Sequence, residues 1–209
     1  MSIDKYLETI IHFASTEQYS REVLQAREEY FSTLGYVSEE EDDYEEKLRR
    51  FLDWYIFDRP LSDTGKSPVE TFYEKLQRTF NEDDENTYSE FRKSIQSLFI
   101  VKKSEETGVQ VKDLITRRKH FVEYDVPKGF VKDEIFQARL IPFQGGFRFG
   151  ESFCFHPISA NKIILKRLKS VDRKRLDQVR VFLDDLLQRR RRSERYRHVD
   201  SLRFYEEKD

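Results

Sequence analysis

The spacing of apolar side chains divides the chain into a helical first part, a strand-rich middle and a helical end. Over residues 3–13 the apolar positions recur every three or four residues, which places them on one face of a helix. A second helix is expected from a capping box at residues 15–18 to about Leu34, with Gly35 following its end. A third is expected after a cap at Ser38, with a wide apolar stripe over residues 44–56.

Two more helices complete the first part. Ser67 and Pro68 have the residue types typical of a helix start, and that helix is expected to end near Phe80. The run NEDDEN at residues 81–86 is interpreted as an acidic loop. A last short helix is then expected from a cap at Thr87 to about Ile95.

From Ser97 the apolar spacing changes to a period close to two, which indicates strands. Five short strands are expected near residues 97–102, 109–111, 120–126, 135–143 and 147–155, and the pair Gly145-Gly146 predicts a hairpin between the last two. This is the pattern of a small SH3-like or OB-like β-barrel. The same strands could also form an open, curled antiparallel sheet against the helices.

After Pro157 the pattern is helical again, with a cap at Ser159 for residues 160–169 and a longer helix from about Ser170. The core stripe of that helix is expected to begin at Leu176. The fold class is therefore α+β, with C-terminal helices packed back on the rest. We divide the chain into an acidic helical region (1–96), a small β-barrel (97–157) and basic C-terminal helices with a tail (158–209).

Composition narrows the class of protein. Aromatic residues make up 14% of the 209 residues, which excludes a fully disordered chain. The single cysteine, Cys154, excludes an internal disulfide and a cysteine-based zinc cluster, and it favours a reducing compartment. There is no apolar run of membrane-spanning length. We therefore expect a cytoplasmic protein without a membrane partner.

The net charge of −2 conceals an asymmetry between the two halves. Residues 1–96 carry 23 Asp/Glu and 12 Lys/Arg, whereas residues 97–209 carry 17 Asp/Glu and 26 Lys/Arg. The two halves could neutralise each other within one molecule, or the basic half could meet an external polyanion.

Two basic clusters are candidates for polyanion binding. Arg117, Arg118 and Lys119 lie between two expected strands, and Arg189, Arg190, Arg191 and Arg192 end the long C-terminal helix. Basic loops on a small barrel, together with exposed aromatic residues such as Phe121 and Tyr124, are typical of proteins that bind single-stranded nucleic acid. Alternatively, the helix-terminal arginines interact with the negative end of the helix dipole and with the acidic half.

Catalytic and cofactor motifs are weak. The segment DTGKS at residues 63–67 resembles the end of a phosphate-binding loop, but Pro60 stands where the first glycine is needed, so we interpret it as a turn. Cys154 and His156 share a strand face, and we interpret them as a buried thiol beside a partly exposed imidazole. We expect no catalytic residue, metal or cofactor.

Two stretches together resemble a known kind of protein. Trp54, Phe57 and Asp58 form a W-x-x-F-D helix end, and residues 108–116 with 136–142 form a barrel segment reading roughly G-x-x-V-x-D-L-x-T … A-R-L-x-P. This combination resembles a family of uncharacterised bacterial proteins, some of which carry a metal-binding SEC-C tail that this chain lacks. The resemblance implies a bacterial source and the order of helices and barrel. It implies no activity.

These observations lead to one functional hypothesis and two alternatives. The leading hypothesis is a non-catalytic intracellular interaction or adaptor protein with a protein partner. The first alternative is a nucleic-acid-binding protein that uses the basic barrel loop and the C-terminal arginines. The second is an enzyme whose polar residues come together only in the fold. The oligomeric state and the process served stay open.

Overall fold

Residues 2–32, 44–123, 129–196 and 198–206 are described by the computed structural model, and they belong to two units with separate cores. Unit 1 comprises Met1–Ile95, Ile141–Gly145 and Gly150–Ser152. Unit 2 comprises Gln96–Leu140, Gly146–Phe149 and Phe153–Asp209. The fold class is α+β, as the pattern of apolar positions predicts. The division into three parts by composition stays a prediction.

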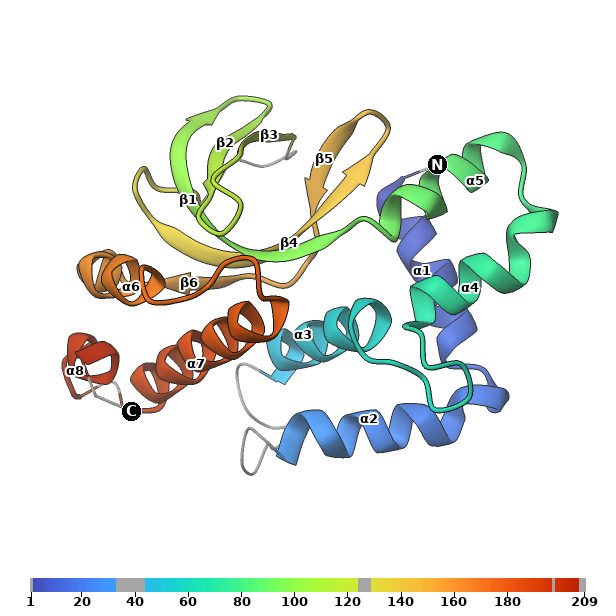
Figure 1. The fold of residues 1–209 in the computed structure, drawn as a ribbon, viewed down its shortest axis with the longest axis horizontal. Helices are drawn as coiled ribbons and strands as arrows, with labels where there is room; N and C mark the ends of the chain where they lie inside the picture. Colours follow the sequence, from blue (N-terminus) through green and yellow to red (C-terminus); the bar gives the residue numbers. More distant parts are fainter. Residues whose placement is uncertain (1, 33–43, 124–128, 197, 207–209) are drawn as a thin grey trace. The chain divides into compact units, whose positions relative to one another are not determined.

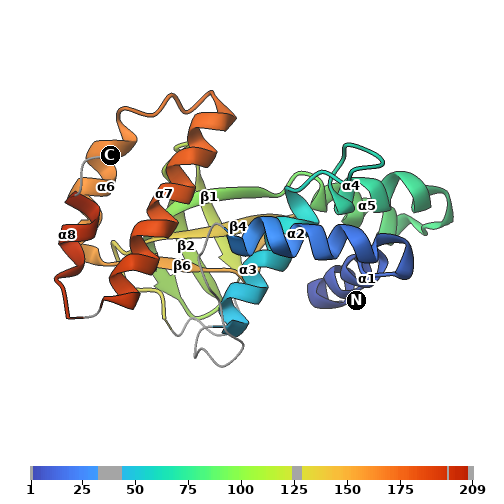
Figure 2. The ribbon, with the colours of Figure 1, turned by 90° about the horizontal axis from the view of Figure 1, so that it is seen from below.

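Unit 1 is built from helices whose apolar faces meet in one aromatic-rich core (Figure 1). The helices are α1 (Ile3–Ala14), η1 (Glu17–Tyr19), α2 (Ser20–Ser32), α3 (Tyr44–Phe57), α4 (Pro68–Leu76), η2 (Gln77–Thr79) and α5 (Glu82–Phe91). Figure 2 shows α2 beside α3, and these two helices are in contact. Tyr6, Phe72, Tyr88 and Phe91 form a chain of ring contacts at centroid distances of 4.7–6.2 Å.

The sequence signals for helix starts have different outcomes. At α4 the prediction is confirmed, because Glu70 Oε2 accepts a hydrogen bond from the backbone N–H of Ser67 at 3.2 Å and Pro68 follows the cap. Ser15, the cap of the box predicted at residues 15–18, is instead the C-cap of α1, and its Oγ donates to the carbonyl of Ile11 at 2.6 Å. The short helix η1 then precedes α2. The residues predicted as a helix end at Gly35 and a cap at Ser38 lie outside the described residues.

The prediction of an acidic loop at residues 81–86 is wrong. Helix α5 begins at Glu82, and Asn81 is its cap, with Asn81 Oδ1 accepting from the backbone N–H of Asp84 at 2.9 Å. The acids that follow lie in the first helical turn, where the positive end of the helix dipole stabilises negative charge. Thr87, predicted as a cap, lies in the middle of the helix and donates to the carbonyl of Asp83 at 2.9 Å.

The strands of unit 2 form one sheet in the order β3-β2-β1-β4-β5, with β6 also paired to β4. Their bounds are β1 (Ile95–Glu105), β2 (Gly108–Asp113), β3 (Lys119–Glu123), β4 (Ile135–Phe143), β5 (Gly146–Phe149) and β6 (Cys154–His156). The pairs β1–β2, β2–β3 and β4–β6 are antiparallel. The strand predicted over residues 147–155 is therefore two strands, separated near Gly150–Ser152.

The sheet curls into a half-barrel, so that of the two forms predicted the curled antiparallel sheet is the one observed (Figure 1). Its outer strands β3 and β5 approach each other, and the rings of His120 and Phe147 lie 4.9 Å apart. The hairpin between β4 and β5 is confirmed. Gln144 and Gly145 form its turn with φ values of 50° and 77°, the left-handed conformation that a two-residue hairpin turn needs.

The C-terminal helices of unit 2 cover one face of this sheet (Figure 2). They are η3 (Ile158–Ala160), α6 (Asn161–Leu168), α7 (Leu176–Arg195) and α8 (Ser201–Glu206). The stripe predicted to begin at Leu176 is confirmed further along α7, where Leu183 and Leu186 are buried, but Leu176, the first residue of the helix, is 82% exposed. Phe204 and Tyr205 of α8 are buried in the same core, although the sequence predicts only a tail after the long helix.

Candidate functional site

The predicted basic turn between β2 and β3 is fixed by one buried carboxylate. Asp113 is 1% exposed, and its Oδ1 accepts from Ser97 Oγ at 2.8 Å and from the backbone N–H groups of Ile115 and Thr116 at 2.7 and 3.1 Å. Its Oδ2 accepts from Thr116 Oγ1 at 2.8 Å. The backbone N–H of Asp113 donates to the carbonyl of Arg118 at 2.9 Å, which closes the turn.

This anchor holds the three predicted basic residues at the surface. Arg117, Arg118 and Lys119 are all exposed, and among the described residues no carboxylate lies within ion-pair distance of them. Arg117 has a left-handed backbone with φ of 67°, which is uncommon for a residue with a side chain. Burial lowers the pKa of the neighbouring His120, and Asp113 offsets this only in part.

The four predicted C-terminal arginines have different surroundings. Arg189 is 5% exposed; its Nε donates to Asp185 Oδ2 at 2.8 Å and its Nη1 to the carbonyl of Phe204 at 2.7 Å. Arg190 forms an ion pair with Glu194 at 2.9 Å. Only Arg192 is exposed at the surface, and Arg191 is partly buried. Arg189 is therefore an internal tie between α7 and α8, and it is not available to an external polyanion.

Cys154 and His156 belong to the interior of unit 2. Both are buried, so the prediction of a partly exposed imidazole is wrong for His156, which is 2% exposed. Its Nδ1 lies 2.8 Å from Tyr205 Oη, and its Nε2 lies 3.3 Å from Gln137 Nε2. Gln137 Nε2 also donates to the carbonyl of Leu183 at 3.0 Å. Burial raises the pKa of Tyr205 well above its ordinary value. This network joins β4, β6, α7 and α8.

The segment that resembles a phosphate-binding loop is a structural turn in unit 1. The backbone N–H of Leu61 donates to the carbonyl of Lys66 at 2.9 Å, and Gly65 takes a left-handed φ of 66°. The ammonium of Lys66 donates to Glu74 Oε1 at 2.6 Å, so its charge is used within the unit. The contacts of this turn are those of a loop between α3 and α4.

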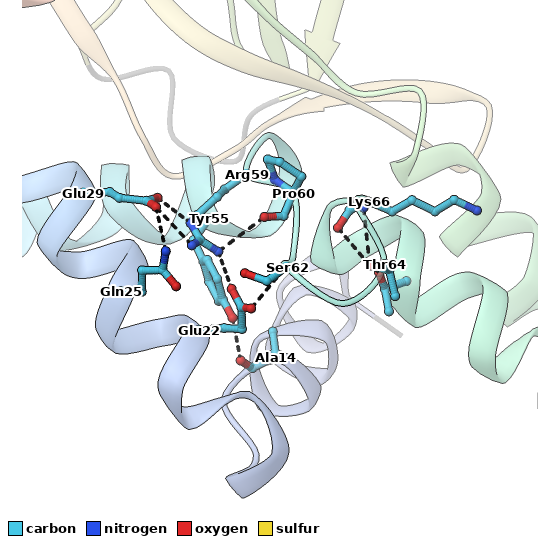
Figure 3. A network of polar contacts seen from close by, with 11 residues as sticks. Ala14, Glu22, Gln25, Glu29, Tyr55, Arg59, Pro60, Ser62, Thr64 and Lys66 are labelled. Carbon is cyan, nitrogen blue, oxygen red and sulfur yellow. Dashed lines mark hydrogen bonds and ion pairs between the residues drawn. The ribbon is translucent and has the colours of Figure 1, made fainter.

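A buried arginine that sequence reasoning missed lies beside this turn (Figure 3). Arg59 is 5% exposed; its Nη1 donates to Glu22 at 2.7 Å and its Nε to Glu29 at 2.7 Å. Burial opposes the ionisation of Glu22, but hydrogen bonds from Arg59 and Ser62 outweigh it and lower its pKa. The hydrogen bond from Arg59 likewise lowers the pKa of Glu29. The cluster fixes α2 to the end of α3.

An apolar groove on unit 1 was also not predicted from the sequence. Leu7 and Ile11 of α1 form one side of its floor, and Leu52 and Ile56 of α3 form the other. Because each pair is spaced by four residues, each presents two side chains along one helix face. Phe57, Ile141 and the segment Gly150–Ser152 complete the lining. The groove has a volume of about 210 Å³.

The rim of this groove is acidic. Four carboxylates line it, from Asp4 and Glu8 of α1, Asp53 of α3 and Glu151, against the single guanidinium of Arg49. Asp4, Glu8 and Glu151 are exposed. The apolar stripes of α1 and α3 are wider than one contact with the core requires, and this is a sequence signal for additional apolar surface on these helices. The groove also requires residues 141 and 150–152, and the spacing of residues in the sequence cannot predict that these lie beside α1 and α3.

Comparison with known proteins identifies a family but no activity. The model of a family described as "Family of unknown function (DUF7986)" matches residues 12–182. Neither the curated proteins nor the solved structures include a match to the chain. Within the described ranges, none of the helices combines the length and apolarity that crossing a membrane requires.

Proposed function

We propose that this chain, which belongs to the family of unknown function DUF7986, is an interaction protein whose groove between α1 and α3 binds a basic amphipathic helix of a partner protein. The observation that carries the proposal is an apolar floor surrounded by carboxylates. Leu7, Ile11 and Leu52 remain only partly buried in unit 1, so they have apolar surface that a partner can cover. Covering such surface is the main favourable term in protein association.

The size of the groove favours a peptide over a small molecule. Sites for drug-sized ligands have volumes of about 300–1,000 Å³. The groove has about 210 Å³, which suits a few side chains of a larger partner. Two helices that flank an apolar furrow are also the arrangement used for helix-in-groove recognition, in which apolar residues at i, i+3, i+4 and i+7 of the ligand occupy the furrow.

The acidic rim determines which charged residues the polar face of the bound helix should carry. The carboxylates of Asp4, Glu8, Asp53 and Glu151 exceed the one guanidinium of Arg49. Lysine and arginine on the flanks of a bound helix would meet this potential, whereas glutamate there would be repelled. The partner is therefore proposed to carry basic residues beside its apolar anchors.

The setting of the protein is part of the same proposal. A non-catalytic role in the cytoplasm of a bacterial cell is supported by the single cysteine, Cys154, and by the resemblance of the W-x-x-F-D helix end and the barrel segment to uncharacterised bacterial proteins.

The test uses synthetic 18-residue amphipathic peptides with leucine on one face and either lysine or glutamate on the other. Fluorescence anisotropy with the full-length chain should detect binding of the lysine peptide and none of the glutamate peptide. Leu7→Lys should abolish the binding, because it places an ammonium on the apolar floor. Leu24→Lys is the matched control, since Leu24 is 68% exposed on α2 and does not line the groove.

A second pair of variants tests the rim without touching the floor. Glu8→Lys with Glu151→Lys reverses two exposed rim charges and should weaken the lysine peptide at least tenfold, an effect that shrinks as salt is added. Glu28→Lys with Asp63→Lys makes the same charge change at exposed positions elsewhere on unit 1. Equal weakening by both pairs, or equal binding of both peptides, would contradict the proposal, and so would the absence of any binding.

A further inference from the structure

The outward face of strands β2 and β3 carries basic side chains around one exposed aromatic ring. Lys119, Phe121 and Glu123 alternate on β3, and they pair with Lys112, Gln110 and Gly108 of β2. Side chains two residues apart on a strand point to the same face, so these six positions share one surface. Phe121 is 41% exposed at its centre, although most aromatic residues of unit 2 are buried.

Phe121 is held in place from below. A Cβ atom added to Gly108 would lie 2.8 Å from Phe121 Cζ, so the ring extends over the backbone of Gly108. Only glycine leaves room for this close approach. The ring is thus supported by the neighbouring strand while a large part of it faces solvent, which is the condition for stacking a planar group on it.

The positive charge beside the ring is concentrated at one end of the face. Lys112 and Lys119 are direct cross-strand neighbours, and like charges in that position are destabilising. The turn fixed by Asp113 adds Arg117 and Arg118 at the same end of these two strands. At the other end, Glu123 forms an ion pair with Arg148, and Glu105 forms one with Lys103 at 3.3 Å, so these two acids have cationic partners.

We propose that this face binds single-stranded nucleic acid, with one base stacked on Phe121 and the phosphates next to it held by Lys112, Lys119, Arg117 and Arg118. The combination of an exposed aromatic platform with a basic track is how proteins bind single strands without sequence preference. An anion between Lys112 and Lys119 would relieve the repulsion that their pairing creates. The site lies in unit 2 and does not rest on the groove of unit 1.

The test is an anisotropy titration of the full-length chain with a fluorescein-labelled 20-nucleotide oligouridylate. With four phosphate contacts, the affinity should fall by about 50-fold between 50 and 200 mM salt, since each contact contributes about 0.7 to the logarithmic salt slope of a single strand. Arg117→Ser with Arg118→Ser leaves two contacts, and the same salt step should then cost only about 7-fold. Lys166→Ser with Lys169→Ser removes two exposed charges, one from α6 and one from the residue that follows it, and is the matched control.

Variants of Phe121 separate stacking from charge. Phe121→Leu keeps Gly108 covered but removes the π face, and it should weaken binding by about 5-fold or more without changing the salt slope, because stacking contributes about 1–3 kcal/mol per base. Phe121→Trp should retain the affinity of the original protein. Leu176→Ala, at the 82% exposed start of α7, should have no effect.

Three results would overturn the proposal. Equal affinity for an RNA duplex of the same length would mean that only phosphates are contacted. Efficient competition by a 20-residue oligoglutamate would identify an acidic protein as the ligand of this face. An undetectable complex at 50 mM salt would remove the site altogether.

Discussion

The two basic clusters of unit 2 have similar side chains, but Arg189 of the second cluster has surroundings opposite to those of Arg117 and Arg118 of the first. At the turn before β3, the exposed Arg117 and Arg118 are held by hydrogen bonds that the buried Asp113 makes to the backbone of the turn. At the end of α7, Arg189 is itself the buried group, and it binds Asp185 and the carbonyl of Phe204. In the first cluster, the buried carboxylate of Asp113 holds the turn whose arginines are exposed. In the second, the buried cation is Arg189 itself.

The contrast shows that a run of basic residues does not define a binding surface by itself. What decides its role is whether the fold supplies acceptors within reach. Asp185 accepts from Arg189 and also forms an ion pair with Arg167 at 2.8 Å, so α6 and α7 share one carboxylate. No comparable acceptor among the described residues lies within ion-pair distance of Arg117 or Arg118.

The largest expected effect is the loss of Arg189. Arg189→Met should lower the free energy of unfolding by about 4 kcal/mol, within the range of about 3–5 kcal/mol for breaking a buried ion pair. The loss is large because the carbonyl of Phe204 loses its donor and α8 loses one of its ties to α7. The measurement is a urea unfolding curve of each protein.

The control for this change is on the same helix. Arg195 lies in the last turn of α7 and is exposed, so Arg195→Met should cost less than about 1 kcal/mol through its interaction with the helix dipole. If Arg189→Met and Arg195→Met unfolded at the same urea concentration, the proposed difference between a buried and an exposed arginine on α7 would be wrong.

Local patterns are the part of this fold that the sequence predicts well. The helix α1, the stripe of α3 and the helix start at Ser67 and Pro68 each depend on residues within one or two turns, and each is confirmed. The alternation of buried and exposed residues along β2 and β3 and the hairpin at Gly145 are likewise local, whereas β4 is buried along almost its whole length. The helix predicted from Thr87 to about Ile95 begins earlier, at Glu82, and ends at Phe91; its first turn was missed because the acids there were interpreted as a loop, although Asn81 is a strong cap.

Distant contacts account for what was not predicted. The burial of Arg189 depends on a carbonyl 15 residues further along the chain, and that of His156 depends on Tyr205, 49 residues away. The groove of unit 1 needs residues 150–152 beside α1 and α3. Seven residues were predicted to bind a polyanion, and three of them, the turn residues Arg117, Arg118 and Lys119, are exposed as expected. Their exposure could be predicted because charged residues in turns are usually exposed. That they bind a polyanion stays a prediction.

Arg59 in unit 1 is a buried arginine that binds carboxylates, as Arg189 is in unit 2, and it therefore gives a second test of the comparison. Arg59→Met should lower the free energy of unfolding at neutral pH by about 3 kcal/mol, at the lower end for a buried pair because Glu29 is 45% exposed. Arg49→Met is the control; its pair with Glu45 is exposed and should contribute about 0.2–1 kcal/mol.

The pH dependence of this effect has a definite sign. Hydrogen bonds from Arg59 hold the pKa of Glu22 and Glu29 below the ordinary value of 4.5, although burial opposes the shift at Glu22. A carboxyl whose folded pKa is lowered adds stability above the unfolded pKa, and that stability is lost as pH falls through the folded pKa. Unfolding curves between pH 7 and 3 should therefore converge for Arg59→Met and the original protein. A constant difference across that range would contradict this explanation.

The smallest expected effect on stability is at the exposed basic turn before β3. Arg117→Ser with Arg118→Ser should change the free energy of unfolding by less than about 0.5 kcal/mol, as is usual for surface substitutions. The reason is that the turn is held by Asp113 through the backbone of Ile115 and Thr116, which neither substitution touches. Urea unfolding under the conditions used for Arg189→Met makes the comparison direct. A loss as large as that of Arg189→Met would mean that these arginines are internal ties as well, and the exposed face of β2 and β3 would then lose the charge on which its proposed ligand depends.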